Sequence, residues 1–427
     1  MDALNKLSAT EAALRIAAGK LTSEALVAAC LERIGEREKD VQAWASIDPK
    51  LALAQARARD KEPRRSRLHG IPVGVKDVFD TADLPTEYGS PIYRGNRASC
   101  DAACAAQVRE LGGVILGKTV TTEFATRHPG KTRNPHNLKH TPGGSSQGSA
   151  AAVADWMAPL AIGTQTTSSV IRPAAYCGVV GYKPSFGLVN RAGLKALSDS
   201  LDTVGTLTRT VPDAALIVEE LSGGPVTSFD AVSSMKPRIG FCRTPYWRLA
   251  DRPTQEALER AVPRLKRAGA RVAEVDLDGE FARLVEVQIS ISTYEMYRAL
   301  AYERTRFPEL VSETLMGRLL GGGRVTRAVY EEAQAIAQRC RARLQDIFND
   351  YDALLSPSAM GEAPEGLAST GEPTFGASWT VLHCPAVSVP VFKGPRGLPI
   401  GAQITGPLGK DGPTLLCAEW VQRALAE

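Results

Sequence analysis

The chain has 427 residues, of which 44% are hydrophobic and 23% charged, and its net charge is +4. This length and apolar content are enough to bury a large core, as in ordinary globular proteins. So small a net charge gives no support to a nucleic-acid partner, and the absence of an apolar run of about 18 residues excludes a spanning helix.

No signal peptide opens the sequence, and eight cysteines are scattered without a C-x-x-C pair. Reduced thiols of this kind are typical of a cytoplasmic protein. We therefore expect a cytoplasmic location, with no membrane and no nucleic acid as partner.

Helix and strand patterns alternate along the first part of the chain. Ser8 to Glu11 has the form of a capping box, and apolar spacing predicts two helices over residues 8–40, separated at Gly19. Residues 57–67 hold six basic side chains around Pro63 and are interpreted as a solvated connector rather than an anion-binding patch. Residues 68–77 then predict a short strand that ends on Lys76.

The alternation continues to the end of the chain. The expected helices span residues 102–111, 255–268 (kinked at Pro263), 333–348 and 414–425, and the expected strands span residues 114–116, 351–355, 386–391 and 398–404. This order predicts one α/β layer structure without repeats or a domain linker. Residues 361–376, rich in Gly, Pro, Ser and Thr, predict a loop over the site.

The stretch Thr141 to Pro173 is the strongest candidate for a reaction centre. Residues 143–149 and 163–169 are crowded with Gly, Ser and Thr, and an apolar segment joins the two clusters. Glycine allows close approach of backbone to a ligand, and serine supplies a nucleophile and a proton carrier. A flexible linker would not contain the apolar segment.

Three known sequence motifs occur in the chain, but the residues around each of them do not fit the structure that the motif requires. Residues 112–119 satisfy the P-loop pattern, but the predicted helix precedes them and the variable positions are themselves a strand. Residues 144–148 match G-x-S-x-G, yet a loop precedes them and only His383 follows. The histidines His128, His136 and His140 lie beside prolines without a further ligand at metal spacing, so we expect loop histidines and no metal.

With so few histidines, a serine nucleophile needs another base. A lysine can serve if burial lowers its pKa and keeps it neutral. Lys76 suits this role because an apolar strand leads into it.

These residues resemble the amidase signature family, over nearly the whole chain. The matching blocks are residues 70–77, 143–154, 163–169 with 183–184, 200–205 with 209–211, and 398–403. Within the family the sequence is most similar to bacterial malonamidases, at residues 80–90, 92–95 and 169–178.

The resemblance implies a Ser–cis-Ser–Lys triad and an acyl-enzyme. Ser169 would be the nucleophile, Ser145 on a cis peptide would pass the proton, and neutral Lys76 would be the base. Ser146 would support this network or the bound substrate. The backbone N–H groups of Thr166, Thr167, Ser168 and Ser169 would form the oxyanion hole.

Two further expectations concern the substrate. Arg172 corresponds to the arginine with which malonamidases hold a substrate carboxylate, a geometry that suits guanidinium. The alternative for Arg172 is a structural ion pair. The family usually has two glycines before the nucleophile, where this chain has Thr167 and Ser168. We expect these side chains to reshape the acyl pocket of an active enzyme.

The resemblance implies a single α/β domain over residues 1–427, with a mixed sheet flanked by helices. Residues 1–60 would be mainly helical, 68–215 would carry the signature, and 216–427 would complete the domain. The expected activity is hydrolysis of a small linear amide such as malonamate, without a cofactor, in a homodimer. The alternatives are an ester or carbamate hydrolase or acyltransferase, the glutaminase-like subunit of a tRNA amidotransferase, and a catalytically silent binding protein.

Overall fold

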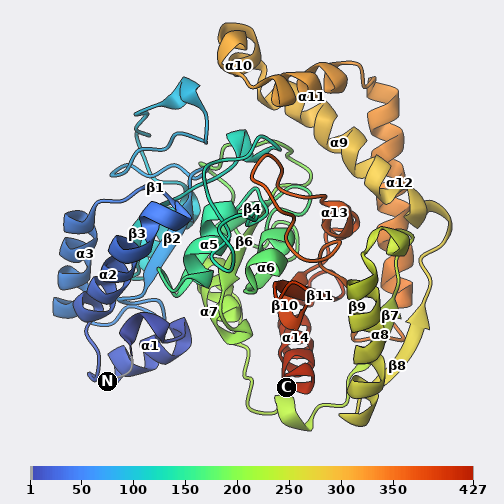
Figure 1. The fold of residues 1–427 in the computed structure, drawn as a ribbon, viewed down its shortest axis with the longest axis horizontal. Helices are drawn as coiled ribbons and strands as arrows, with labels where there is room; N and C mark the ends of the chain where they lie inside the picture. The colour runs from blue at the N-terminus through green and yellow to red at the C-terminus, as the bar shows by residue number, and fades with distance from the viewer. Residues whose placement is uncertain (1–2, 427) are drawn as a thin grey trace.

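A computed structural model describes residues 3–426, and one large sheet runs through its centre (Figure 1). The strands are β1 (Trp44–Ser46), β2 (Pro72–Lys76), β3 (Val114–Thr119), β4 (Leu160–Gln165), β5 (Val180–Lys183), β6 (Thr203–Thr208), β7 (Arg238–Cys242), β8 (Arg271–Val275), β9 (Ala353–Pro357), β10 (Ala386–Lys393) and β11 (Pro399–Thr405). They form an 11-stranded sheet in the order β1-β3-β2-β4-β6-β5-β10-β11-β9-β7-β8.

The sheet is mixed, and its parallel part positions the candidate site. Strands β3, β2 and β4 are parallel neighbours, whereas β4 and β6 are antiparallel. Val75 of β2 lies opposite Ile162 of β4, so the residues that follow these two strands emerge side by side. The carboxyl ends of neighbouring parallel strands are a usual place for a ligand site in α/β folds.

The α-helices of the described chain alternate with these strands. They are α1 (Ala9–Ala17), α2 (Ser23–Val41), α3 (Pro49–Lys61), α4 (Ala103–Glu110), α5 (Gln147–Ala154), α6 (Ile171–Cys177), α7 (Val211–Ser222), α8 (Arg252–Arg267), α9 (Leu284–Ala299), α10 (Ala301–Arg306), α11 (Glu313–Gly323), α12 (Arg327–Ile347), α13 (Thr374–Val381) and α14 (Asp411–Leu425).

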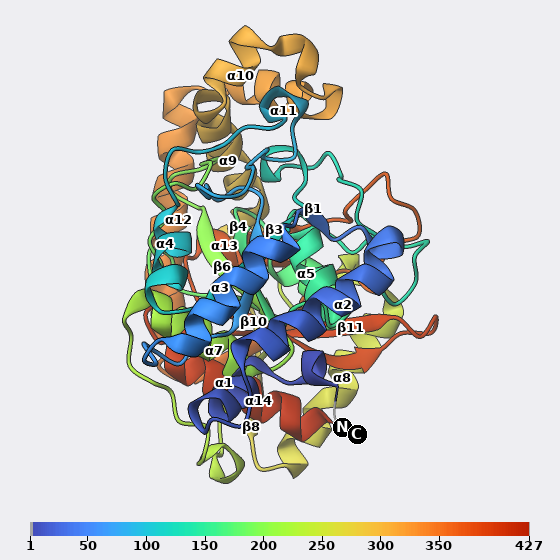
Figure 2. The ribbon, with the colours of Figure 1, turned by 90° about the vertical axis from the view of Figure 1, so that its left-hand side faces the viewer.

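Helices cover both faces of the sheet. Helices α1, α4, α7, α8 and α14 share one apolar cluster with the strands. Helices α2, α3 and α5 share a second cluster, and α5 and α6 a third. Figure 2 shows α2 and α3 lying side by side over the end of the sheet that carries β1 and β3. The expected fold class, one α/β domain with a large mixed sheet flanked by helices, is therefore confirmed.

A helical arm, α9 to α12, rises beyond the sheet (Figure 1). The lower part of α9 and most of α12 pack against β7, β9 and α13. Higher up, Leu315 and Leu319 of α11 pack with Met296 and Leu300 of α9. Gly322 of α11 lies so close to α9 that a Cβ atom there would be 2.1 Å from the carbonyl oxygen of Thr293.

The two helices expected over residues 8–40 are α1 and α2, and the Ser8 hydroxyl accepts a hydrogen bond from the Glu11 N–H as the capping box predicts. The interpretation of residues 57–67 as a connector is wrong for residues 57–61, which end α3. Their charges are balanced by acidic neighbours, since Arg57 lies 2.7 Å from Glu24. Local sequence did not reveal α3 because its apolar positions are mostly alanines, a weak periodic signal.

Other boundaries differ by a few residues. The helix expected at 333–348 begins at Arg327, and the loop expected at 361–376 ends where α13 begins, at Thr374. Among the described residues no helix is long and apolar enough to cross a membrane. All eight cysteines lie in the described part and are free thiols.

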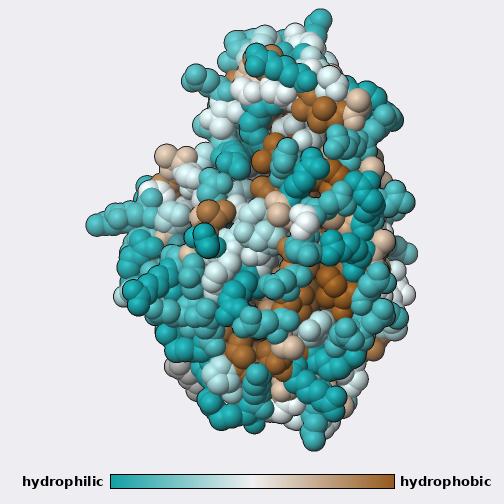
Figure 3. Space-filling view, turned by 90° about the vertical axis from the view of Figure 1, so that its right-hand side faces the viewer, coloured by the Kyte–Doolittle hydropathy of each residue, from teal (hydrophilic) through white to brown (hydrophobic). Residues whose placement is uncertain are grey.

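The edge strand β8 lies on the face shown in Figure 3, where apolar patches are surrounded by polar side chains. Arg243, beside this edge, pairs with Glu274 of β8 at 2.7 Å and with Glu259 of α8 at 3.5 Å. Charged side chains at an open edge discourage pairing with a strand of another molecule.

Candidate active site

Three segments meet at the carboxyl ends of β2 and β4. Lys76 is the last residue of β2, Ser145 and Ser146 precede α5, and residues 166–170 connect β4 to α6. Each of the three candidate catalytic side chains is buried, with Lys76 and Ser145 at 0% and Ser169 at 8% exposure. The structure therefore brings together the segments that the sequence singled out.

Within residues 3–426, the Lys76 amine makes hydrogen bonds only to hydroxyl groups. Its Nζ lies 2.7 Å from Ser145 Oγ and 2.7 Å from Thr164 Oγ1. Burial lowers the pKa of Lys76 well below its ordinary value, and the more distant charge of Asp202 opposes this shift only in part. A buried lysine without a carboxylate partner favours its neutral form, which is the form that can accept a proton.

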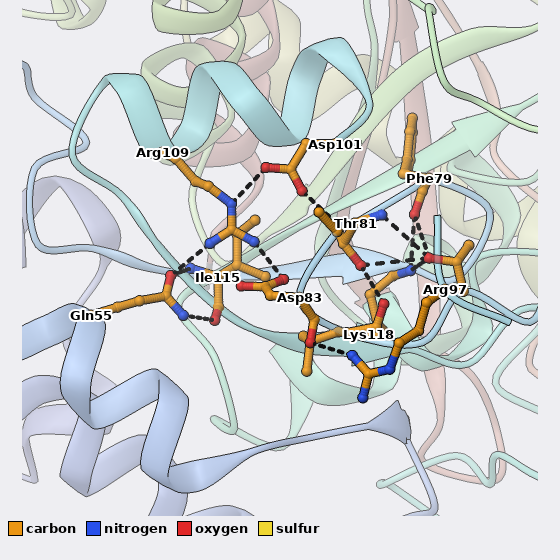
Figure 4. Close-up of polar contacts among 12 residues, drawn as sticks. Gln55, Phe79, Thr81, Asp83, Arg97, Asp101, Arg109, Ile115 and Lys118 are labelled. Carbon is orange, nitrogen blue, oxygen red and sulfur yellow. Dashed lines mark hydrogen bonds and ion pairs between the residues drawn. The ribbon is translucent and has the colours of Figure 1, made fainter. Parts of the chain in front are cut away.

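A second buried lysine, Lys118 of β3, has quite different partners (Figure 4). Its Nζ lies 3.0 Å from Asp77 and donates hydrogen bonds to the Phe79 carbonyl at 2.8 Å and to Thr86 Oγ1 at 2.6 Å. Burial lowers the pKa of Lys118 too, but Asp77 counters it. Lys118 belongs to the P-loop-like motif, and here it fixes the segment that follows Lys76.

Arg109 holds the same segment from outside (Figure 4). Its guanidinium lies 2.6 Å from Asp83 and 2.8 Å from Asp101, and it donates a hydrogen bond to Gln55 at 3.1 Å. The long connection between β2 and α4 is thus attached to α3 and α4 as well as to β3. This attachment keeps the end of β2 in a fixed position.

A third buried lysine, Lys183, donates to the carbonyl oxygens of Pro184 and Cys384. Burial lowers the pKa of Lys183 to about 8. Carbonyl oxygens cannot pass a proton on, whereas hydroxyl groups can. Lys118 also bonds to a hydroxyl, that of Thr86, but Asp77 beside it favours its charged form. Of these three lysines, Lys76 alone combines hydroxyl partners with the lack of a carboxylate partner.

The Gly144–Ser145 peptide bond is cis. This conformation lies between the turn at Gly143 and the start of α5, and it directs the Ser145 hydroxyl to Lys76. Ser146 faces another way: its hydroxyl donates to the Thr164 carbonyl at 3.2 Å and accepts from the Thr164 N–H at 3.3 Å. Ser146 therefore joins the start of α5 to β4 and does not line the cavity described below.

Each backbone carbonyl group of residues 166–169 accepts a hydrogen bond from another part of the protein. The Thr166 carbonyl accepts from Gln288, the Thr167 carbonyl from Thr380, the Ser168 carbonyl from the Arg172 N–H, and the Ser169 carbonyl from the Ser146 N–H. The four backbone N–H groups of residues 166–169 donate no hydrogen bond to any acceptor within residues 3–426. Such a row of free donors is what an oxyanion hole requires.

The side chains that replace the family's two glycines are accommodated by specific neighbours. Thr167 Oγ1 accepts a hydrogen bond from Gln288 Nε2 at 2.8 Å, which ties this residue to α9. Ser168 points toward α13, where a Cβ atom on Gly376 would lie 2.2 Å from Ser168 Oγ. Thr167 borders the cavity and Ser168 does not, so the replacement changes the pocket at position 167 only.

A cavity of about 120 Å³ lies above this loop. Its volume is far below the roughly 300–1,000 Å³ of sites for drug-sized ligands. The lining comes from the catalytic loop (residues 166–170), α6, the connections after β3 and β5, the arm, and α13 with the loop before it: Ala125, Thr126, Arg127, Thr166, Thr167, Ser169, Arg172, Leu197, Val285, Gln288, Ile289, Ser292, Met296, Arg318, Glu372, Pro373, Thr374 and Ala377. The segment 361–376 thus contributes to the site as expected of a covering loop.

Arg172 lines the cavity, but its hydrogen bonds go to the protein. Its terminal nitrogens donate to the Gly144 carbonyl at 2.7 Å, the Gly371 carbonyl at 2.8 Å and Thr370 Oγ1 at 3.1 Å. Burial lowers the pKa of Arg172 to about 10. Arg172 therefore joins the cis-peptide turn to the covering loop, a structural contact that sequence reasoning considered only as an ion pair.

The loop histidines have structural contacts. His136 Nε2 is 2.9 Å from the Cys177 carbonyl and His140 Nδ1 is 2.8 Å from the Ala363 carbonyl. Within residues 3–426 no three His, Cys, Asp or Glu side chains are grouped as ligands of a metal ion.

Sequence reasoning assigned no role to several residues that shape the site. Thr164 bonds to Lys76, Gln288 reaches the catalytic loop from α9, and Gln165 Oε1 accepts from the Val170 and Ile171 N–H groups at 2.9 and 3.1 Å. Thr164 could have been found, because it lies within the hydroxyl-rich cluster of residues 163–169. Gln288 lies more than a hundred residues away and carries no local signal.

A family model described as Amidase matches residues 25–415, and the chain belongs to this family. It is an enzyme that hydrolyses amide C–N bonds. The A subunit of the glutamyl-tRNA(Gln) amidotransferase of Halothermothrix orenii is 32% identical, over 95% of this chain and 94% of that protein.

Two solved structures are also similar. The native peptide amidase from Stenotrophomonas maltophilia has a TM-score of 0.84 at 29% identity, covering 99% of this chain and 98% of that one. A crystal structure of an amidase has a TM-score of 0.88 at 29% identity, covering 98% and 100% of the two chains.

Proposed function

We propose that this enzyme hydrolyses a small linear amide through an acyl-enzyme, with Ser169 as nucleophile, Ser145 as proton relay and Lys76 as base. The observation that supports this most strongly is the buried Lys76 amine, whose direct contacts are two hydroxyl groups, one of them on Ser145. Histidine is not needed, because a neutral amine can take the proton.

In the first half of the reaction, the Ser169 hydroxyl attacks the amide carbon while its proton passes to Ser145 Oγ and the Ser145 proton passes to Lys76 Nζ. The same path in reverse protonates the nitrogen of the leaving group, the C–N bond breaks, and ammonia or an amine departs. A water molecule then loses a proton to the relay and hydrolyses the acyl-enzyme, which releases the acid and restores Ser169.

The Ser169 hydroxyl makes no side-chain hydrogen bond within residues 3–426. Catalytic hydrogen bonds often tighten only when the substrate is present. Substrate in the cavity would exclude water from Ser169 and bring its carbonyl oxygen to the free N–H groups of residues 166–169. One such donor is worth roughly 10²–10³ in rate.

The cavity supports a short substrate with a negative group. Its charged lining residues are Arg127, Arg172, Arg318 and Glu372, which gives an excess of positive charge. A carboxylate-bearing amide such as malonamate fits this charge and the small volume.

The test is a panel of small amides and esters, assayed for ammonia and acid with the purified chain. The panel contains malonamate, succinamate, their neutral diamides, glutamine and the methyl esters of the same acids. We expect ammonia from a carboxylated amide, lost at least about 10³-fold in Ser169→Ala and Ser145→Ala. Full turnover by Ser169→Ala would overturn the proposal, and hydrolysis of the esters alone would assign the triad to ester hydrolysis.

The similarity to tRNA amidotransferase subunits favours a second candidate, release of ammonia from glutamine for use by partner proteins. Turnover of glutamine that appears only when such partners are added would support it. Turnover of malonamate by the purified chain alone, with no glutamine activity, would exclude it.

A further inference from the structure

One arginine in the cavity has no partner in the protein. Arg318 lines the cavity together with Ser169, and within residues 3–426 its guanidinium makes no hydrogen bond and no ion pair. Burial, with the neighbouring charge of Arg127, lowers the pKa of Arg318 to about 10, which leaves it charged at neutral pH. Arg318 is partly buried, and a charge that is partly shielded from water is stabilised by a partner of opposite charge.

The other cavity arginines are already engaged. Arg172 donates to the Gly144 and Gly371 carbonyls, as described above. Arg127 lies 3.7 Å from Glu372, and both of these side chains are about half exposed. In Arg172 only Nε lacks a partner, whereas the whole Arg318 guanidinium is free among the described residues, so Arg318 is the cavity cation best able to take a ligand.

The position of Arg318 is fixed by the packing of α11. Leu315, Leu319 and Gly322 are buried, and Arg318 lies three residues after Leu315 and four before Gly322, on the same side of the helix. The first turn of α11 is attached to the connection after β3, because the Ser312 N–H donates to Glu123 Oε1 at 3.1 Å. The helix therefore holds Arg318 over the site rather than leaving it on a mobile surface segment.

We propose that Arg318 binds the anionic end of the substrate and that it, rather than Arg172, selects carboxylate-bearing amides. This inference rests on the proposed function of the Ser169 site. The guanidinium would grip the carboxylate with two parallel hydrogen bonds, which suits a planar group. With the carboxylate fixed on the arm and the amide carbonyl at the catalytic loop, the substrate spans the short cavity.

The experiment compares Arg318→Gln with the wild-type enzyme on malonamate and succinamate and on the uncharged malonamide and succinamide. A lost charged hydrogen bond should raise KM for the carboxylated amides about 10-fold to 100-fold and leave their kcat within a few-fold. The uncharged diamides should be hydrolysed as before. Arg324→Gln, an exposed arginine at the end of the same helix, is the matched control and should change neither class.

Equal loss on charged and uncharged amides would overturn the inference, as would an unchanged KM for the carboxylated ones. A second measurement separates this inference from the proposed function: binding of malonate to Ser169→Ala, with and without Arg318→Gln, by calorimetry. Malonate binding that Arg318→Gln abolishes would support the anion site even if no amide is turned over. Malonate binding that is unaffected by Arg318→Gln would overturn the anion site even if the amidase activity is established.

Discussion

At the scale of single residues, the identity of the partners decides what a buried lysine does. Lys118 faces Asp77 and two oxygen acceptors, and Lys183 faces two carbonyl groups, so both amines serve to hold the chain. Lys76 faces the hydroxyls of Ser145 and Thr164 and no carboxylate. Only this arrangement leaves an amine that is neutral and linked to a group able to pass protons.

Lys76→Met should abolish activity and change the dependence of stability on pH. In the unfolded wild-type chain Lys76 binds a proton below its ordinary pKa of 10.5, whereas in the folded protein its pKa is far lower. The unfolded state therefore binds more protons, and wild-type stability rises with pH between these two values. Between pH 6 and pH 10, the melting temperature of the wild type should rise relative to that of Lys76→Met as the pH increases.

If the melting temperatures of the two proteins instead changed in parallel with pH, Lys76 would be protonated in the folded protein. The activity of the wild-type enzyme gives an independent check. Because the neutral amine is the active form, kcat/KM should fall as the pH is lowered through the depressed pKa of Lys76.

Gly376→Ala tests how the chain accommodates Ser168. The added Cβ would lie 2.2 Å from Ser168 Oγ, and such overpacking costs about 1–3 kcal/mol. We expect a lower midpoint of denaturant unfolding and slower turnover, since the strain falls on the residue before the nucleophile. Ser168→Gly/Gly376→Ala should recover most of both, because the two closest atoms, Ser168 Oγ and Cβ, are gone, while the Cα of residue 168 remains 2.9 Å from the added Cβ. If the double variant recovered neither the unfolding midpoint nor the turnover rate, the effect of Gly376→Ala would not come from its contact with Ser168.

At the scale of elements, the site is assembled from two short loops and the helical arm. Strands β2 and β4 supply Lys76 and Thr164 from neighbouring parallel positions, and the turn before α5 supplies Ser145. Helix α9 then contributes Gln288, whose amide donates to the Thr166 carbonyl at 3.0 Å and to Thr167 Oγ1. The arm is therefore part of the active site as well as one wall of the cavity.

The close crossing of α11 and α9 can be tested with two neighbouring glycines. Gly322→Ala would place a Cβ 2.1 Å from the Thr293 carbonyl and push α11 away, while Gly321 has open space around it. Gly322→Ala should cost about 1–3 kcal/mol and raise KM for a carboxylated amide. Gly321→Ala should be neutral or slightly stabilising, since alanine favours a helix by up to about 1 kcal/mol over glycine. Equal effects of the two changes on KM and unfolding would contradict this packing.

At the scale of the whole molecule, the fold class followed from the alternation of patterns along the chain. Strand β2 and the clusters around Ser145 and Ser169 were recognisable because their signals are local: an apolar run ending on a lysine, and dense runs of Gly, Ser and Thr. The order of the 11 strands had no such local signal. Pairings such as β10 with β5 join segments about two hundred residues apart.

The substrate end of the site was the least predictable part. The resemblance to malonamidases pointed to Arg172 as the carboxylate-binding residue, yet it bonds to backbone carbonyls. Arg318 lies on α11, which was not among the expected helices, and its relation to the cavity depends on how α11 crosses α9. Contacts of that kind are set by tertiary packing, and no spacing rule along the chain gives them.

The most direct test of the central claim is the mass of the intact protein, quenched during turnover of a carboxylated amide or its methyl ester, followed by peptide mapping. We expect an added acyl mass on the peptide that contains Ser169, absent in Ser169→Ala and formed far more slowly in Lys76→Met. An acyl group on another residue, or unchanged turnover in Ser169→Ala, would contradict it.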